Sequence, residues 1–166
     1  MAQFYFSEEQ KFNQLWVWII LLPVIVIVGV QIFDLLNKNE SLNLENESLT
    51  GMIISIVVVA AVAALFMTMK LTTRIDKLTI RVRFYPFINR TIPWQDVKEA
   101  YVRTYKPLLE YGGWGIRRRI GSIAYSVSGK QGLQLSLTNG KKVLIGTKKV
   151  EELKSLLQKR ELPEEF

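Results

Sequence analysis

Two uninterrupted apolar stretches dominate the hydrophobic pattern of the first 70 residues. They run from Leu15 to Phe33 and from Met52 to Met69, and neither contains a charged side chain. A helix of about 19 residues extends about 28 Å, close to the roughly 30 Å hydrocarbon core of a bilayer. A core helix of a soluble protein would show a polar stripe, which both stretches lack. The pattern therefore predicts a transmembrane helical hairpin over residues 15–71, with spans at 15–33 and 52–69 and a loop at 34–51.

Residues 1–14 are expected to form a short interfacial helix. Ser7 followed by Gln10 matches a capping box. Trp16 and Trp18 open the first span and are expected to act as interfacial anchors, because aromatic side chains favour the headgroup boundary. A partner-binding arm is the alternative for this segment. A cleaved signal peptide is disfavoured, since the leader lacks both a positive charge excess and a small-residue cleavage site.

Beyond Lys70 the pattern changes to short runs in which apolar and polar positions alternate, as in half-buried β-strands. Asn139-Gly140 predicts a two-residue hairpin turn between two such runs. Val150, Leu153, Leu156 and Leu157 then share one face of a predicted C-terminal helix. We therefore expect an α+β membrane protein, in which the hairpin precedes a seven-stranded antiparallel open barrel with a C-terminal capping helix. The barrel and its helix would form the domain at 72–166.

Charge is distributed unevenly along the chain. From Lys70 onward, 20 Lys and Arg against nine Asp and Glu give a net charge of +11, whereas the loop between the apolar stretches holds one lysine and four acids. Flanks rich in Lys and Arg stay in the cytoplasm. Both termini are therefore predicted to be cytoplasmic, with the acidic loop outside.

Several short blocks in the second half of the chain carry a family resemblance. They are Ile92-Pro93-Trp94, Asp96-Val97, Tyr111 to Arg117, Ala124 to Gly129, Gly132 to Leu135, Asn139 to Lys142, Ile145 to Thr147 and Glu151 to Leu153. In this order they resemble bacterial membrane proteins in which two transmembrane helices precede a pleckstrin-homology-like (PH-like) domain. The resemblance covers nearly the whole chain. It implies a PH-like fold and a multi-pass protein of the bacterial inner (plasma) membrane, and it implies no established activity.

Residue types that commonly carry catalysis are scarce. The chain has no histidine and no cysteine, which removes the commonest general base, the commonest metal ligand and the thiol nucleophile. Gly113-Trp114-Gly115 lacks the third glycine and the strand–helix context of a dinucleotide site. We expect no enzyme, no catalytic residue, no cofactor and no metal site.

The stretch YGGWGIRRR, residues 111–119, has a structural and a functional interpretation. Its glycines favour a bend or bulge, with Trp114 closing the barrel end. Strand alternation places Arg117 and Arg119 on one face and Arg118 on the other. The functional interpretation assigns contacts with anionic headgroups or partners to five arginines: Arg81, Arg83, Arg103, Arg117 and Arg119. Near a membrane surface each would contribute about 1 kcal/mol, but positive-inside bias explains the same charge.

The expected function is a non-enzymatic interaction or scaffold module in a membrane protein complex, with protein partners or as a homo-oligomer. The alternatives are a binder or sensor of anionic lipid headgroups and an accessory subunit of a transporter. The turn near Asp76-Lys77, which corresponds to the inositide-binding turn of some eukaryotic PH domains, is short and holds an acid. That departure disfavours a specific inositide pocket. Nucleic acid is not an expected partner, because the basic residues are dispersed and the chain is anchored.

Overall fold

The computed structural model describes residues 5–12, 15–37 and 47–161. The chain divides into two compact units. One unit, called the β domain here, joins the N-terminal segment up to Phe12 to the segment from Met69 onward. The other, called the helical unit, is the segment that lies between them in the sequence. The β domain is therefore built from the chain segments that precede and follow the apolar helices in the sequence.

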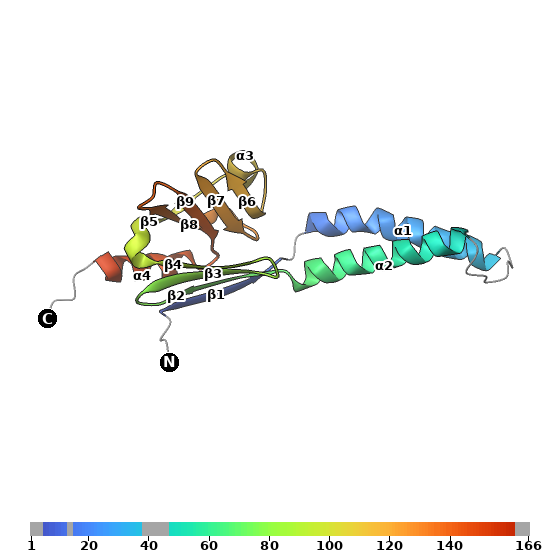
Figure 1. The fold of residues 1–166 in the computed structure, drawn as a ribbon, viewed down its shortest axis with the longest axis horizontal. Coiled ribbons are helices and arrows are strands. Elements are labelled where there is room, and N and C mark those ends of the chain that lie inside the picture. Colours follow the sequence, from blue (N-terminus) through green and yellow to red (C-terminus); the bar gives the residue numbers. More distant parts are fainter. Residues whose placement is uncertain (1–4, 13–14, 38–46, 162–166) are drawn as a thin grey trace. The chain divides into compact units, whose positions relative to one another are not determined.

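The helical unit consists of α1 (Leu15–Asn37) and α2 (Glu47–Thr68), which lie against each other (Figure 1). Within α2, Thr50–Thr68 is long and apolar enough to cross a bilayer, and none of this stretch is buried. The described apolar stretch of α1 is shorter, Leu21–Asp34. One helix of the described chain thus has the length and composition of a membrane span. Residues 38–46 of the predicted external loop lie outside the described residues, and the rest of that loop belongs to the ends of α1 and α2.

The N-terminal segment is a strand, and the predicted interfacial helix is wrong for the described residues. β1 (Phe6–Lys11) pairs antiparallel with β2 (Lys70–Ile75). Its side chains alternate between buried and exposed, with Phe6, Glu8 and Gln10 buried. A helix would spread these three positions around its circumference, whereas a strand buries all three on one face. Pairing with β2 and burial of this face outweigh the local capping pattern.

The described residues form nine strands in two sheets, so the prediction of one seven-stranded antiparallel barrel is wrong. Sheet A has the order β1-β2-β3-β4 and sheet B the order β5-β8-β9-β7-β6 (Figure 1). The remaining strands are β3 (Thr79–Tyr85), β4 (Ile88–Pro93), β5 (Val97–Thr104), β6 (Gly115–Arg119), β7 (Ser122–Ser126), β8 (Gln131–Leu137) and β9 (Lys142–Gly146). A short 3-10 turn, Trp94–Asp96, links the sheets, and β7 and β9 pair in parallel.

The predicted C-terminal helix is confirmed as α4 (Val150–Glu161). Val150, Leu153 and Leu157 are buried, as the helical spacing predicts, and the helix contacts β5 and β1. Its last turn is fixed to sheet A. The guanidinium of Arg160 lies 4.0 Å from the ring centre of Trp94 and donates to the carbonyl of Lys77 at 3.1 Å. The helix thus bridges the two sheets.

Polar side chains of β1 reach the segment that precedes α4. The Glu8 carboxylate accepts hydrogen bonds from the Thr147 hydroxyl at 2.5 Å and from the Lys148 N–H at 2.8 Å. The Gln10 amide donates to the Gly146 carbonyl at 2.9 Å. Buried polar groups need such partners to offset their lost hydration. These bonds join the first strand of the chain to its last helix.

The hairpin between β8 and β9 differs in detail from the prediction. Leu137 donates its N–H to the Lys141 carbonyl at 2.8 Å, so the loop has three residues, Thr138, Asn139 and Gly140. Gly140 has a φ of 77°, in the left-handed region that glycine adopts without strain. A turn followed by a left-handed glycine is a common three-residue hairpin. The turn prediction is confirmed in place, and its length is one residue greater.

Candidate anion-binding groove

The glycine-rich stretch links a short helix to strand β6. The helix, α3 (Pro107–Tyr111), ends at Gly112, which has a φ of 69° and donates its N–H to the Leu108 carbonyl at 3.0 Å. The predicted bend is confirmed, but the helix before it was not predicted. Trp114 is half-buried, and its indole N–H donates to the Gly129 carbonyl at 2.9 Å. It therefore secures the β7–β8 turn instead of a barrel end, because the strands of the described residues form two sheets and no closed barrel.

The three arginines of β6 have different surroundings. Arg117 donates from Nε to the Trp114 carbonyl at 3.0 Å, and Arg119 donates to the Glu110 carbonyl at 2.6 Å. Both side chains thus support the local loop. Arg118 makes no side-chain hydrogen bond or ion pair with another residue in the described ranges. The strand alternation separates Arg118 from its neighbours, as predicted.

The structure does not bring the five predicted arginines together. Arg103 forms an ion pair with Glu110 at 2.8 Å, and this hydrogen bond is the main reason that the pKa of Glu110 is lowered and that of Arg103 raised. Arg81 lies 3.4 Å from the Asp76 carboxylate. Arg83 lies over the Tyr85 ring at 5.5 Å. Two of the five are thus matched with acids outside any shared site.

The predicted membrane anchors fall in α1. Trp18 is 38% exposed. Trp16 belongs to the same helix, but its side chain lies outside the described part of the structure. The exposed position of Trp18 is compatible with contact to lipid.

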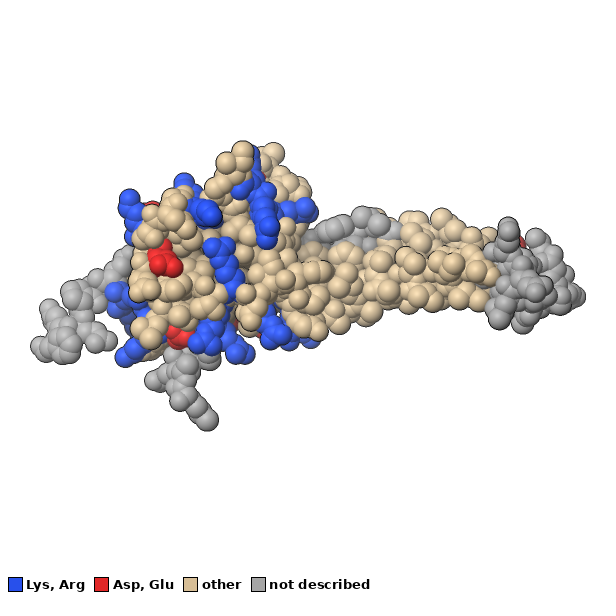
Figure 2. Space-filling model, in the orientation of Figure 1, with Lys and Arg blue, Asp and Glu red and all other residues tan. Residues whose placement is uncertain are grey.

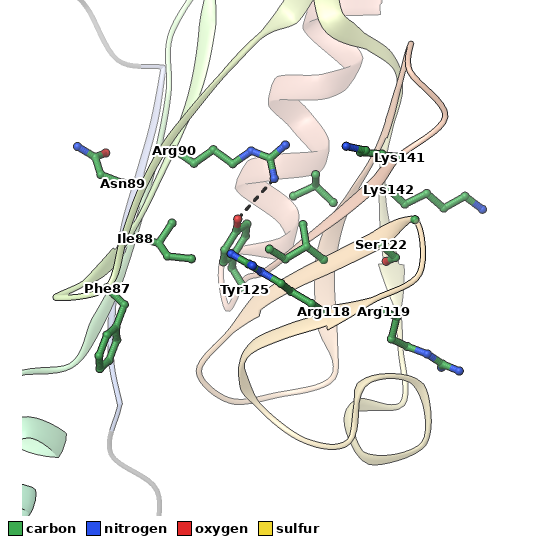
Figure 3. Close-up of a pocket in the computed structure, with 13 residues that line it drawn as sticks. Phe87, Ile88, Asn89, Arg90, Arg118, Arg119, Ser122, Tyr125, Lys141 and Lys142 are labelled. Carbon is green, nitrogen blue, oxygen red and sulfur yellow. Dashed lines mark hydrogen bonds between the residues drawn. The ribbon is translucent and has the colours of Figure 1, made fainter.

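A pocket of about 590 Å³ opens between the β3–β4 turn and the end of sheet B (Figure 3). One wall is the segment 87–90, and the other walls come from the β6–β7 hairpin and the start of β9. We call it the basic groove. Its lining residues are Phe87, Ile88, Asn89, Arg90, Arg118, Arg119, Gly121, Ser122, Ile123, Tyr125, Lys141, Lys142 and Val143. Both sheets are needed to form it, because no single strand supplies more than part of the wall.

Five of the lining residues are basic and none is acidic. Figure 3 shows Arg90 and Arg118 pointing toward Tyr125 from opposite walls, whereas Arg119 points away. Arg90 donates to the Tyr125 hydroxyl in a long hydrogen bond of 3.5 Å, and Tyr125 is 1% exposed. The buried phenol therefore holds one guanidinium at the floor of the groove. Lys and Arg are also spread over the face of the β domain seen in Figure 2.

This set of side chains favours an anion. Guanidinium groups present paired N–H donors that match carboxylate and phosphate oxygens. Neighbouring cations repel each other, and this repulsion is stronger where protein partly excludes water. A bound anion would relieve it and accept hydrogen bonds from both walls. Within the described residues, no group of three or more Asp or Glu side chains could hold a metal ion.

Four basic residues of the groove were absent from the predicted set: Arg90, Arg118, Lys141 and Lys142. Arg119 is the one predicted arginine that lines it. A signal for Arg118 was present, because alternation separated it from Arg117 and Arg119. Arg90 offered no such signal, since its role depends on contact between β4 and Tyr125 of the other sheet.

Comparison with known proteins adds no family to this picture. No family model matches the chain, and no curated protein is significantly similar to it. The relationship to PH-like membrane proteins therefore stays a prediction from the sequence blocks.

Proposed function

We propose that this protein is a membrane-anchored, non-enzymatic module that binds phosphate-bearing lipid headgroups in the basic groove. The observation that carries the proposal is the lining of the groove, which holds five basic residues and no carboxylate. Arg81 and Arg103, by contrast, lie outside it and already face acids. The proposal moves the headgroup contacts from the predicted arginines to the groove.

The anchor belongs to the same proposal. Both α1 and α2 cross the bilayer as a hairpin of a multi-pass protein in the bacterial inner membrane, and both termini are cytoplasmic. The proposal is supported by the apolar stretch of α2, by the contact between α1 and α2, and by the +11 charge from Lys70 onward. Such a module would belong to the family of PH-like membrane proteins that the sequence blocks resemble.

Attachment to a membrane strengthens a weak headgroup site. Each basic residue near an anionic surface contributes about 1 kcal/mol, so five contribute up to roughly 5 kcal/mol. The anchor adds a high effective concentration of lipid, because the domain cannot diffuse away from the surface. A groove of modest intrinsic affinity would therefore be occupied whenever anionic lipid is present.

The test is native mass spectrometry of the full chain, purified from its own membrane in mild detergent. We expect anionic phospholipid to copurify with the unaltered protein. The double variant Arg90→Gln/Arg118→Gln should lose most of this lipid. The control Lys98→Gln/Lys130→Gln removes the same charge at exposed positions that do not line the groove, and it should keep the lipid. Equal loss in both variants would mean that diffuse charge, and not the groove, holds the lipid.

A scaffold role is the second candidate, and a different observation favours it. Three large aliphatic side chains are strongly exposed near the glycine-rich stretch: Leu108 at 68%, Leu109 at 78% and Ile120 at 106%. Two of them lie in α3 and the third between β6 and β7, and exposed apolar patches commonly mark docking sites. The same purification would report this role as a stoichiometric protein partner that survives high salt. The transporter-subunit alternative stays a prediction.

A further inference from the structure

The β3–β4 turn of sheet A carries two exposed aromatic side chains. Tyr85 is 39% exposed and Phe87 is 54% exposed, whereas Phe84 just before them is fully buried. The turn is closed by a hydrogen bond of 2.8 Å from the Phe87 N–H to the Phe84 carbonyl. The large exposed area of Phe87 at the tip of a hairpin is unfavourable in water. Its exposure therefore suggests an apolar environment outside the domain.

The register of sheet A places this turn close to the ends of the strands that connect to the apolar helices. Tyr85 lies opposite Lys70 on β2, and Lys70 lies opposite Lys11 on β1. Only Met69 stands between Lys70 and the last residue of α2. The path from the last residue of α2 to Lys70 takes two residue steps, and one strand spacing separates Lys70 from Tyr85. Together these steps reach roughly 12 Å. Chain connectivity alone thus keeps Tyr85, where the turn begins, within that distance of the end of α2, and Phe87 follows two residues later.

Basic side chains accompany the aromatics at this end of the sheet. The guanidinium of Arg83 lies over the Tyr85 ring at 5.5 Å. Lys11 and Lys70 are the adjacent cross-strand pair. Aromatic rings flanked by Lys and Arg are typical of the boundary between a bilayer and water, where the ring meets the acyl region and the cation meets phosphate.

We propose that the β3–β4 turn enters the headgroup region of the bilayer that α2 spans, with Phe87 as the deepest side chain. This inference rests on the proposed membrane anchoring and does not require an occupied groove. It also deepens the proposed function, because residues 87–90 form one wall of the basic groove. A turn held in the headgroup layer would keep that wall at the level of the lipid phosphates.

The experiment uses the absence of cysteine from the chain. Single cysteines carrying a nitroxide spin label are placed in the full-length protein in lipid nanodiscs, and collision with oxygen and with a water-soluble nickel chelate reports depth. Phe87→Cys tests the turn. Leu78→Cys is the matched control, because it is a 76% exposed apolar residue in the β2–β3 turn at the opposite end of sheet A. Val58→Cys, exposed on α2, calibrates the hydrocarbon core.

We expect the oxygen-to-nickel collision ratio to be several-fold higher at position 87 than at position 78, and highest at position 58. The result should hold in purely zwitterionic nanodiscs, since burial of an aromatic ring needs no anionic lipid. Equal nickel access at positions 87 and 78 would overturn the inference. So would an aqueous signal at position 58, because α2 would then not span the bilayer. Failure of the groove proposal appears instead in the lipid retained by the Arg90→Gln/Arg118→Gln variant.

Discussion

Asp76 illustrates how a single turn residue obtains a lowered pKa in a buried position. Burial acts to raise the pKa of its carboxyl group. The Thr79 N–H at 2.6 Å and the Leu78 N–H at 3.0 Å donate to it, and the Thr79 hydroxyl and Arg81 add further stabilisation of the charge. These interactions outweigh burial, so the pKa of Asp76 lies below its usual value. The same acid fills the turn that the PH-like resemblance matches to an inositide site.

Replacing Asp76 by Asn should reveal this charge as pH-dependent stability. Asn keeps one acceptor oxygen, and hydrogen bonds to a charged acceptor exceed neutral ones by about 1 kcal/mol. We therefore expect Asp76→Asn to lower the free energy of unfolding by about 1–2 kcal/mol at neutral pH. Because the folded-state pKa is depressed, the stabilisation is complete above the ordinary value of 3.8 and is lost as the pH falls through the folded value.

Thermal unfolding of the full chain in detergent, followed by near-ultraviolet circular dichroism, measures this difference. The gap in melting temperature between the unaltered protein and Asp76→Asn should narrow as the pH is lowered to about 3. A gap of constant size would contradict the assignment, since it would show a loss of packing instead of a loss of charge.

Among the elements, β1 has the least expected role. It precedes the apolar helices in sequence, yet it forms an edge strand of the domain that follows them. Its partner is β2, and its buried Glu8 contacts the segment before α4 through Thr147 and Lys148. The β domain therefore depends on residues from both ends of the helical unit. A strand in this position explains why the domain could not be delimited at residue 72.

Phe6→Ala separates the strand from the predicted interfacial helix. Phe6 is 1% exposed, so its truncation should lower the free energy of unfolding of the β domain by about 3 kcal/mol. The neighbouring Tyr5 is 47% exposed, and Tyr5→Ala should change stability by less than about 0.5 kcal/mol. Both values come from denaturant unfolding in detergent. Equal effects of the two substitutions would favour an interfacial helix over an alternating strand.

On the scale of the whole molecule, the chain combines an apolar helical unit with a strongly basic β domain. Positive charge near membrane spans is retained in the cytoplasm. A cysteine at Asn139, in the β8–β9 loop, should therefore react with a membrane-impermeant maleimide only after bacterial cells are permeabilised. A cysteine at Glu40, in the predicted external loop, should react in intact spheroplasts. The cysteine-free parent chain is the control for background labelling.

Labelling of both positions from the same side would contradict the predicted topology of two spans. If only α2 crossed the membrane, the β domain and the loop would also lie on opposite sides. The segment before α1 would then lie on the side of the loop, and β1 could not reach β2. The observed pairing of these strands within one sheet requires the chain before α1 and the chain after α2 to be on the same side. Strand pairing across the helical unit thus argues against a topology in which only one of the two helices spans, whereas labelling tests the two-span topology that the charge pattern predicts.

The sequence by itself determined the elements whose side chains repeat over several turns or strand positions. The apolar stretch of α2, the buried face of α4 and the alternation in β3 are local signals of burial, and they predict their elements without knowledge of neighbours. Alternation also predicted strand β8, but its burial is nearly continuous and includes Gln134. Shorter or conflicting signals failed. α3 has five residues, too few for a helical period to show. The capping box at Ser7 and Gln10 favoured a helix, so the alternation of buried and exposed positions in β1 was not recognised as a strand.

The tertiary structure decided how the strands divide into sheets and where the charges gather. The pairing of β1 with β2 spans the whole helical unit, and the parallel pairing of β7 with β9 crosses β8 in sequence. The groove combines Arg90 of sheet A with Arg118 and Tyr125 of sheet B. These arrangements depend on backbone pairing and on packing between residues far apart in the chain. Periodicity reports only whether a position is buried, and it carries no information about which distant segment covers it.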